Sequence, residues 1–449
     1  MESSTIAIII ILITIVSFIL EKIPLAMTAV LSSIAMGIIL PEMSLGEVYA
    51  GFSSSTVMMV AGMCVVGDSL FQTGMADKLG AAIGASRFAK NERVFTIVVV
   101  ICCTLMSSVL SNSGTIATWM PIIAAVAAKS NGIIRSKMVI MAAGIASAVG
   151  GAGTLVGSGS QQMANTILMT HEGYEAGLTL LDETWIMIPL SIIMILYFGT
   201  VGYDLTKKVL KPEQPDFNKG NYYYSLEEKL KQHPEQTSAQ PEIPKWKGYL
   251  SVAVLAFCII GFIVSSLPGF DEYLNVGIIG LLGAAILITS GCMPLKKTLA
   301  ELDWNTIIIL GAAQGFATGL DVSGGGKVIA DFVLNLFGGD NASPVILMAA
   351  GVIVTTVLTN FMSNSALAAM MTPIYIEIAF QMGVSPVPFV IVIGCIATNL
   401  ACATPVGTPA CTQTLPAGYK YMDYVKIGGP LCVILMIATV FLGPVIYPV

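Results

Sequence analysis

Charged side chains are scarce in this chain. Asp, Glu, Lys and Arg make up only 11% of its 449 residues, whereas hydrophobic residues make up 55% and the mean hydropathy is +0.83. Because a soluble domain carries about 25% charged residues, this composition excludes an ordinary soluble protein and indicates an all-α polytopic membrane protein. The chain also lacks a basic stripe with interleaved aromatic residues, so nothing in it indicates nucleic-acid binding.

Residues that catalyse reactions or bind transition metals are sparse as well. The two histidines, His171 and His233, both fall in predicted loops. The nine cysteines have no Cys-x-x-Cys spacing and lie mostly in apolar segments, which favours small core residues over disulfides or a metal cluster. With no histidine in the membrane and no convincing acid–base pair, an intramembrane enzyme is poorly supported.

The N-terminus lacks the basic region and the small-residue cleavage site of a signal peptide, so we expect a retained first span. A span needs roughly 20 apolar residues. Apolar segments near this length predict crossings over 5–20, 24–40, 53–72, 184–203, 248–267, 274–290, 303–322 and 428–447. A charged, amphipathic piece that follows residue 72 and runs through Arg93 is expected to lie at the membrane interface.

A short polar motif occurs twice inside long apolar segments. Residues 104–121 read TLMSSVLSNSGTIATWMP, and residues 356–373 read TVLTNFMSNSALAAMMTP. In the first copy the motif lies near the centre of a charge-free run of about 35 residues, whose two arms reach only about 24 and 21 Å as helices. Neither arm crosses a hydrocarbon core about 30 Å thick. We therefore predict two re-entrant hairpins, over 94–128 and 344–380.

Each predicted hairpin is followed by a helix that glycine or Thr-Pro residues interrupt. The segment 138–170 contains GGAGTLVGSGS, and Thr154-x-Val156-Gly157 within it matches Thr404-x-Val406-Gly407 in the segment 388–420. Glycine at this density is poor helix material, so both segments are predicted to be broken helices with an unwound loop at the membrane midplane.

The repeated order of segments predicts two halves, 1–203 and 248–449, joined by a polar, proline-containing linker over 204–247 with a short surface helix near 225–232. Each half then has five crossings and one hairpin, and because five is odd the second half is inverted in the membrane. Placing the linker in the cytoplasm puts every lysine and arginine except Lys327 on that side. We expect a cell-membrane protein with a cytoplasmic linker and both termini outside.

Helix ends at the two hairpin tips and the two broken helices define the predicted site. A helix that ends offers free carbonyls to a cation, and one that begins offers free N–H groups to an anion. Neither hairpin interior nor either loop holds a Lys or Arg, so bound cations are the expected balance for an anionic cargo. Ser and Asn in membrane helices often only join helices together, but two copies at the centre of over-short arms favour a function.

These paired motifs resemble those of the divalent anion/sodium symporter family of the ion transporter superfamily, and the resemblance covers nearly the whole chain. It implies a homodimer that carries di- or tricarboxylates such as citrate, or sulfate, by an elevator motion of a transport domain against a scaffold domain. It also implies two sodium sites, the first at Ser107, Ser111, Asn112 and the backbone near Gly153, the second at Thr359, Met362, Asn364 and the backbone near Ala403. The implied substrate contacts are Ser111, Asn112, Ser113, Thr154, Ser363, Asn364, Ser365, Thr404 and Pro405.

The chain departs from the family pattern in three ways. Both tips end in Ser rather than Thr, the loops continue as GSGSQQ (157–162) and GTPACT (407–412), and the chain begins about one span early. Gln161 and Gln162 either contact a substrate with extra polar groups or simply start a helix.

Our first hypothesis is a secondary active transporter that couples sodium to the import of a di- or tricarboxylate. The alternative on the same fold is a sodium-independent dicarboxylate exchanger, and a remote alternative is an anion channel. Uptake that needs internal counter-substrate and ignores sodium would indicate the exchanger. A channel would conduct continuously, without saturation or counterflow.

Overall fold

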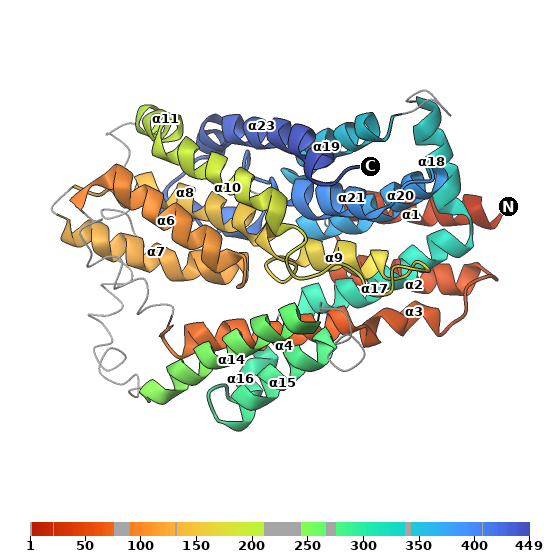
Figure 1. Cartoon of the computed structure of the whole chain (residues 1–449), viewed down its shortest axis with the longest axis horizontal. Helices are drawn as coiled ribbons and strands as arrows, with labels where there is room; N and C mark the ends of the chain where they lie inside the picture. The colour runs from red at the N-terminus through yellow and green to blue at the C-terminus, as the bar shows by residue number, and fades with distance from the viewer. Residues whose placement is uncertain are drawn as a thin grey trace.

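The computed structural model describes residues 2–20, 22–75, 90–130, 133–210, 244–265, 275–302, 304–336, 343–405 and 407–449 (Figure 1). Every regular element within these ranges is helical. By length and hydropathy, four of the described helices are able to cross a membrane, or up to six if each of two bent helix pairs forms one span. The chain is an all-helical membrane protein with several apolar helices.

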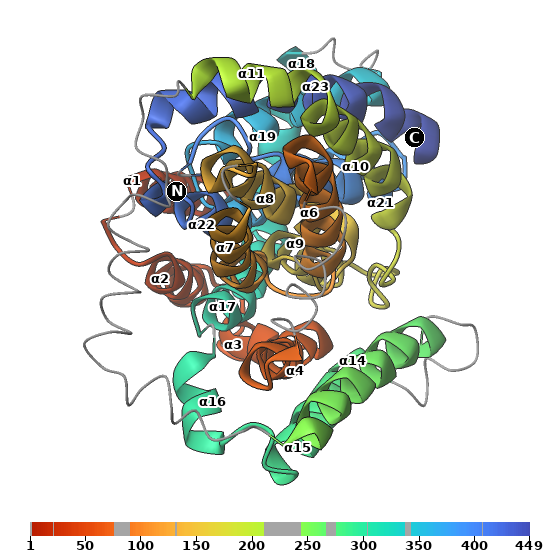
Figure 2. The same ribbon diagram turned by 90° about the vertical axis from the view of Figure 1, so that its left-hand side faces the viewer.

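A first bundle combines the early helices of both halves. Its contacts pair α4 with α15 and α2 with α17, so each of these contacts joins one half of the chain to the other. Figures 1 and 2 agree in placing α4, α14, α15 and α16 together along one side of the molecule. The first bundle comprises α1 (Ser3–Leu20), α2 (Leu25–Ile39), α3 (Glu47–Ala50), η1 (Gly51–Ser53), α4 (Ser55–Gln72), α14 (Lys245–Ser265), α15 (Val276–Thr289), α16 (Leu295–Glu301) and α17 (Trp304–Val322).

A second bundle contains all the segments predicted to bind ligand. At its centre, 94% of the residues of Ser136–Gly153 are buried within the protein, against 28% of the most apolar stretch of Tyr421–Ile446 at its edge. The second bundle comprises α6 (Glu92–Ser107), α7 (Asn112–Lys129), α8 (Ser136–Gly150), η3 (Gly151–Gly153), α9 (Gly159–Leu168), α10 (Thr184–Gly199), α11 (Val201–Val209), α19 (Pro344–Thr359), α20 (Asn364–Gln381), α21 (Val387–Phe389), η6 (Val390–Ile396), η7 (Ala397–Asn399), α22 (Pro409–Thr412), η8 (Leu415–Ala417) and α23 (Tyr421–Ile446).

The two bundles meet mainly through α9, which contacts both α4 and α17, and through α20, which contacts α17. Helix α18 (Gly325–Leu336) packs on α20 of the second bundle and on α1 of the first, after a bend of 75° between α17 and α18. The half-chains are therefore intertwined, and neither forms a separate body.

Both predicted hairpins are pairs of helices that break at the Ser-Asn-Ser motif. Helix α6 begins after Asn91, whose side chain accepts hydrogen bonds from the N–H groups of Arg93 (3.0 Å) and Val94 (3.2 Å). Helix α19 instead begins at Pro344, whose missing N–H costs nothing at a helix start. Helices α7 and α20 both start at the Asn of the motif.

The two broken helices are interrupted where the sequence predicts, but they differ in form. In the first, α8 tightens into η3 and the chain re-enters a helix at Gly159. In the second, the stretch Val390–Ile396 is π-helical before η7, and only short helical turns follow its loop. The second broken helix therefore has the more irregular backbone. Such π-helical turns often occur at functional sites.

Some predicted boundaries shift. Helix α11 continues to Val209, inside the predicted linker 204–247, after a bend of 48° from α10, and α14 begins at Lys245. Helix α23 begins at Tyr421, before the predicted span 428–447, because Asp423 accepts a hydrogen bond from the N–H of Lys420 (2.9 Å) and caps the start. The predicted surface helix near 225–232 and most of the interfacial piece before Arg93 lie outside the described residues.

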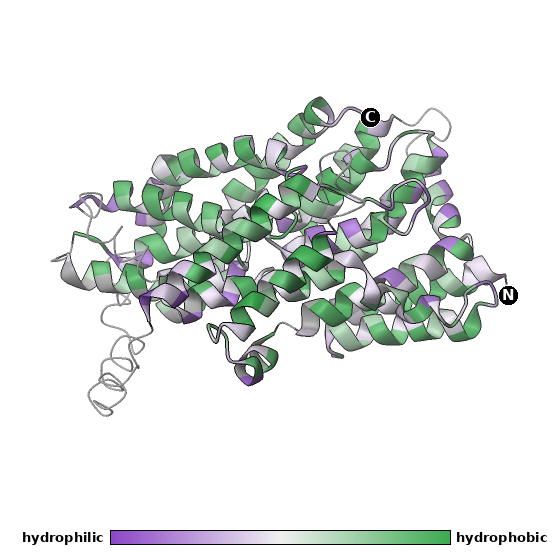
Figure 3. Cartoon of the chain, turned by 60° about the horizontal axis from the view of Figure 1, so that its bottom comes forward, coloured by the Kyte–Doolittle hydropathy of each residue, from purple (hydrophilic) through white to green (hydrophobic). Residues whose placement is uncertain are grey.

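The outer surface suits a lipid environment. Large hydrophobic side chains such as Ile38 (72% exposed), Phe441 (68%) and Val445 (76%) face outward, and Figure 3 shows hydrophobic residues along most of the length of the helices. A soluble monomer rarely exposes so much contiguous apolar surface. Figure 1 places the N- and C-termini in the same half of the long axis and the ends of α11 and α14 at the other end. Which end faces the cytoplasm stays a prediction, as do the re-entrant hairpins and the inversion of the second half.

Candidate substrate and cation site

The first tip is built from the end of α6, the start of α7 and the first broken helix. The Ser107 hydroxyl, fully buried, lies 2.7 Å from the Asn112 side-chain oxygen and donates to the carbonyl of Ser147 at 2.6 Å. Ser111 precedes the helix and its hydroxyl accepts from the N–H of Gly114 at 3.1 Å. The Ser-Asn-Ser letters thus both cap α7 and dock it against α8.

Oxygen atoms converge around Asn112. Its amide group lies 3.2 Å from the carbonyl oxygens of both Ser147 and Gly157 and 2.7 Å from the Ser107 hydroxyl. With the amide oxygen on this side, these four oxygens share one hydroxyl proton, and they repel one another unless a cation lies among them. With the amide turned by 180°, its nitrogen donates to all three. The first orientation gives an oxygen-only set, which a hard cation such as sodium prefers, and the turned orientation satisfies the amide without a cation.

The first loop is locked onto the tip by a close backbone approach. The Thr154 hydroxyl donates to the carbonyl of Ser108. A Cβ atom on Gly157 would lie 2.2 Å from the carbonyl oxygen of Gly151 and 2.9 Å from those of Ser107 and Ser108. Only glycine fits at residue 157, because all three obstacles are backbone atoms.

The second tip repeats these contacts with the equivalent residues. The Thr359 hydroxyl, fully buried, lies 2.8 Å from the Asn364 side-chain oxygen and donates to the carbonyl of Thr398. The Thr404 hydroxyl donates to the carbonyl of Asn360. A Cβ atom on Gly407 would lie 2.6 Å from the carbonyl oxygen of Thr359. The structure therefore brings the predicted residues of each tip into contact with the loop that follows it.

Two asparagines that we did not predict complete the second tip. Asn360 accepts from the N–H of Ala403 at 2.8 Å and donates to the carbonyl of Thr356 at 2.7 Å, so it fixes the backbone of the loop. Asn399 is fully buried, and its side-chain oxygen accepts from the Asn364 amide at 3.3 Å. The signal for Asn399 was a single amide in the apolar run PFVIVIGCIATNL, directly before the loop.

Asn399 also links the second tip to the first broken helix. Its side-chain oxygen accepts from the Ser158 hydroxyl at 3.0 Å, and its amide donates to the Ser160 hydroxyl at 2.6 Å. Gln161, which starts α9 beside Ser160, donates to the carbonyl of Gly151 at 2.7 Å. A continuous chain of polar contacts therefore runs from Asn364 through Asn399 to the loop on which Asn112 docks.

The remaining predicted residues lie in the same two places. Ser113, Ser363 and Ser365 are half-buried at the starts of α7 and α20, while Met362 is buried in the second tip. The carbonyl of Gly153 accepts from the Thr184 hydroxyl at 2.7 Å, and that of Pro405 accepts from the Thr412 hydroxyl at 2.6 Å. Gln162 is buried, and its amide donates to the carbonyl of Val156 at 3.2 Å. The amides of Gln161 and Gln162 therefore both donate to backbone carbonyls.

None of these site residues is charged, and helix ends provide the local electrostatics. The starts of α7 and α20 each carry roughly half a positive charge. Among the described residues, no cluster of three or more His, Cys, Asp or Glu residues is able to hold a metal ion. The arrangement offers hydroxyl, amide and carbonyl oxygens to a hard cation and N–H groups to an anion.

An all-helical membrane protein with broken helices and polar helix ends inside it is typical of a transporter. The chain belongs to the citrate transporter family, whose family model matches residues 15–394. The chain is thus a helical, multi-pass membrane protein of a transporter family.

Curated relatives share this class at low identity. The chain is 24% identical over 430 residues to an uncharacterized transporter of Haemophilus influenzae, covering 93% of this chain and 86% of that one. It is 22% identical to the sodium-dependent dicarboxylate transporter SdcS of Staphylococcus aureus, covering 87% of this chain and 76% of SdcS. For the uncharacterized transporter YfbS of Escherichia coli the identity is 29%, but the match covers 43% of this chain and 31% of YfbS. A second partial relative, sll0640 of Synechocystis, is covered over 32% of its length, so the chain spans about a third of these two relatives.

Solved structures show the same fold. The structure of MtrF from Neisseria gonorrhoeae matches with a TM-score of 0.62 at 14% identity, covering 99% of this chain and 94% of MtrF. The YdaH transporter of Alcanivorax borkumensis matches with a TM-score of 0.61 at 16% identity, covering 88% of this chain and 86% of YdaH. At these identities the likeness concerns the fold alone.

Proposed function

We propose that this chain is a sodium-coupled symporter that imports a di- or tricarboxylate. The observation that carries the proposal is that a buried hydroxyl at each helix break joins the motif asparagine to a backbone carbonyl of the broken helix, so that uncharged oxygens converge in the same way at both tips. Two relatives support the coupling ion by their names, the sodium-dependent dicarboxylate transporter SdcS and a probable sodium/sulfate cotransporter of Chlamydomonas reinhardtii, which is 22% identical over 206 residues.

The first sodium would lie among the oxygens of Ser107, Asn112 and the carbonyls of Ser147 and Gly157, which lie within 3.2 Å of the Asn112 amide. The second would lie by Thr359, Asn364 and the carbonyl of Thr398. The carbonyls of Gly153 and Ala403, with Ser111 and Met362, remain further candidates from the resemblance. The sequence analysis did not predict Ser147, Gly157 or Thr398 as ligands.

The anion would lie between the two helix starts. The N–H groups at the starts of α7 and α20 and the hydroxyls of Ser113, Ser363 and Ser365 would bind it. Thr154, Thr404 and Pro405, which the resemblance also implies, would hold the loops in place, because both threonine hydroxyls donate to backbone carbonyls. Helix ends supply only part of the charge that a dianion needs, and bound sodium supplies the rest. Substrate and cations therefore stabilise one another in the same site.

The membrane potential favours the same coupling. Moving two negative charges inward against an inside-negative potential costs about 4.6 kcal/mol per 100 mV, at about 2.3 kcal/mol per charge. More than two sodium ions carried with the dianion would reverse the sign of this cost.

The two bundles fit an elevator mechanism. The second bundle contains both tips and both broken helices, while the first bundle contains none of them. We assign the second bundle as the transport domain and the first as the scaffold, which would also form the homodimer contact. In this arrangement α9 and α20 slide along α17 and α4, the contacts that join the bundles.

Uptake into proteoliposomes tests the proposal. Radiolabelled citrate, succinate and sulfate should each be offered with an inward sodium gradient, with potassium in its place, and with unlabelled substrate inside. Uptake of at least one anion should need external sodium and should increase with an inside-negative potential. Uptake that needs internal substrate and ignores sodium would establish an exchanger instead, and sodium-independent current without saturation would establish a channel.

A further inference from the structure

A buried carboxyl group lies outside the proposed site. Glu183 ends the loop that precedes α10. Its side chain is 0% exposed, and neither carboxyl oxygen has a hydrogen-bond partner. It does not cap α10 either, because no side-chain cap hydrogen bond forms there.

The neighbouring acid shows what an ordinary loop carboxylate does. Asp182 accepts from the N–H of Thr179 at 2.7 Å and from the Thr179 hydroxyl at 2.5 Å. Asp182 is half-buried, while Glu183 is turned into the protein. The two adjacent residues therefore make a matched pair of a partnered and an unpartnered acid.

Three titratable groups face Glu183. The thiol of Cys395, in the π-helical η6, lies beside the carboxyl group without reaching hydrogen-bonding geometry. Asp182 adds a like charge from the same loop, and Tyr447, which follows α23, faces both acids while its hydroxyl donates to the backbone carbonyl of Asp182. None of these groups is a cation.

An ionised carboxylate cannot be stable in such a place. Burying a charge without a partner or hydrogen bonds costs so much that the group takes up a proton instead. Loss of water on burial, with the nearby charge of Asp182, raises the pKa of Glu183 from 4.5 to about 8.

We propose that Glu183 is a proton-binding site that is occupied in this conformation. Loss of the proton would weaken the packing of the α10 start against η6 and the residues after α23. Because η6 leads through η7 to Asn399, the proton would be linked to the conformation of the second broken helix. The site is separate from the proposed sodium sites and does not depend on which anion the chain carries.

The sign of the pH effect follows from the raised pKa. Between the unfolded value near 4.5 and the folded value of about 8, the folded chain binds more protons than the unfolded chain. Stability attributable to Glu183 therefore falls as pH rises through this window and is fully lost above it. Glu183→Gln keeps the shape and stays neutral, so it should not show this loss.

Thermal unfolding of the full-length, detergent-purified protein tests the proposal. Melting temperatures of the wild type, Glu183→Gln and the control Asp182→Asn should be measured from about pH 5 to about pH 9. We expect the wild type to lose on the order of 5 °C relative to Glu183→Gln across this range, and Asp182→Asn to keep most of that loss, because burial is the largest cause of the raised pKa of Glu183. Parallel curves for the wild type and Glu183→Gln would overturn the site, whether or not the protein transports sodium.

Infrared spectroscopy of the wild type keeps the test independent of the variant's folding. At about pH 7 a C=O stretching band of a protonated carboxylic acid should be present and should disappear by about pH 9, a range in which a carboxyl group with an ordinary pKa gives no such band. Selective isotope labelling of glutamate should shift the band. Its absence near pH 6 would overturn the proposal.

Discussion

At the first tip the Ser111 hydroxyl accepts from the N–H of Gly114 at 3.1 Å and caps α7, whereas at the second tip Ser363 makes no capping hydrogen bond. The asparagines differ in the same way. Asn112 faces oxygens of its own half, while the Asn364 amide donates to Asn399 at 3.3 Å, which in turn is held by Ser158 and Ser160 of the other half. The two identical Ser-Asn-Ser motifs therefore have different surroundings.

Replacing the motif asparagines should have the largest effect. Asn112→Ala and Asn364→Ala each remove a ligand or hydrogen bond to a charged group, worth about 2–3 kcal/mol, so uptake should fall by about 30–150-fold while the protein still folds. Near-normal uptake in both variants would contradict the assignment of the site.

Aspartate at the same positions separates the two tips. Asn112→Asp keeps a side-chain oxygen beside the oxygens of Ser107, Ser147 and Gly157. It should retain sodium-dependent uptake, because a carboxylate is a suitable ligand for a cation there. Asn364→Asp loses the donor to Asn399 and should be as inactive as Asn364→Ala. If Asn112→Asp is inactive and Asn364→Asp is active, the turned orientation of the Asn112 amide is correct and the first cation site is wrong.

Alanine at the loop glycines should have the next largest effect. A Cβ at Gly157 meets backbone oxygen at 2.2 Å and one at Gly407 meets it at 2.6 Å, so both variants should lose uptake, and Gly157→Ala should lose more. Gly429→Ala is the control, because a Cβ there has nothing within 4 Å. Equal uptake in all three would show that the loops move away from the tips.

Asn399→Ala should act on the second tip and on its link to Ser158 and Ser160. Loss of its buried hydrogen bonds costs about 1–3 kcal/mol, which we expect as a weaker apparent affinity for sodium by about tenfold with less change in maximal rate. Asn165→Ala is the matched control, since Asn165 is also buried but accepts from the N–H of Leu178 at 2.5 Å, away from the tips. An unchanged sodium dependence in Asn399→Ala would remove the difference between the tips.

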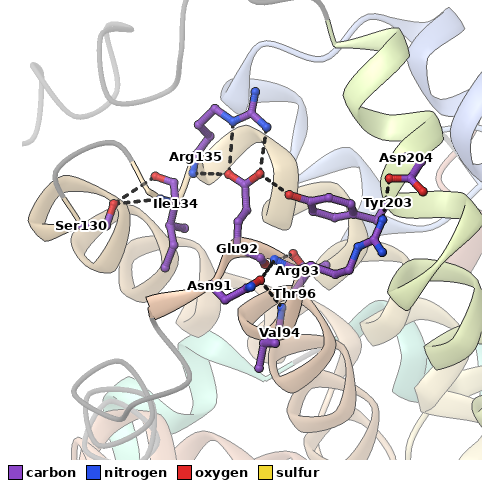
Figure 4. Close-up of polar contacts among 10 residues, drawn as sticks. All are labelled: Asn91, Glu92, Arg93, Val94, Thr96, Ser130, Ile134, Arg135, Tyr203 and Asp204. Atoms are coloured by element: carbon purple, nitrogen blue, oxygen red, sulfur yellow. Dashed lines mark hydrogen bonds and ion pairs between the residues drawn. The ribbon is translucent and has the colours of Figure 1, made fainter.

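The smallest predicted effect is on folding stability, and it comes from the end of the first hairpin that lies away from its tip. Figure 4 shows the Glu92 carboxylate, 8% exposed, accepting from the N–H of Arg135 (2.7 Å), its guanidinium (2.8 and 3.2 Å) and the Tyr203 hydroxyl (2.7 Å). The ion pair between Arg93 and Asp204 is more exposed, at 40% and 61%. Glu92→Gln should therefore destabilise the protein by about 2 kcal/mol and Asp204→Asn by less than about 1 kcal/mol, measured by thermal unfolding.

The Glu92 effect should depend on pH. Burial raises the pKa of Glu92, but the hydrogen bonds from Arg135 and Tyr203 and the charge of Arg135 outweigh it and lower the pKa overall. The stabilisation is present above the ordinary pKa and is lost as pH falls through the lowered value. The difference in unfolding free energy between the wild type and Glu92→Gln should thus disappear at acid pH. A difference that does not change with pH would show that Glu92→Gln destabilises the protein through packing instead.

The sequence predicted the helices well because their signals are local. Apolar runs mark the long helices, and the hairpin helices α6, α7, α19 and α20 lie close to the predicted ranges 94–128 and 344–380. The Thr-x-Val-Gly repeats marked the two breaks, since glycine and Thr-Pro residues disfavour helix wherever they occur. Contacts between Thr154 and Ser108 and between Thr404 and Asn360 also joined predicted segments, although the ligands themselves stay proposed.

The composition and the repeated motif determined by themselves that this chain is a helical membrane protein with two broken, polar regions, because hydrophobicity and helix breaking are properties of short segments. Only the tertiary structure decided that Asn399 meets Ser158, 241 residues away, and that Glu183 is buried beside η6 and Tyr447. Such contacts depend on how the two halves pack together. A single asparagine or glutamate looks the same in the sequence whether its partners lie in the protein or in water.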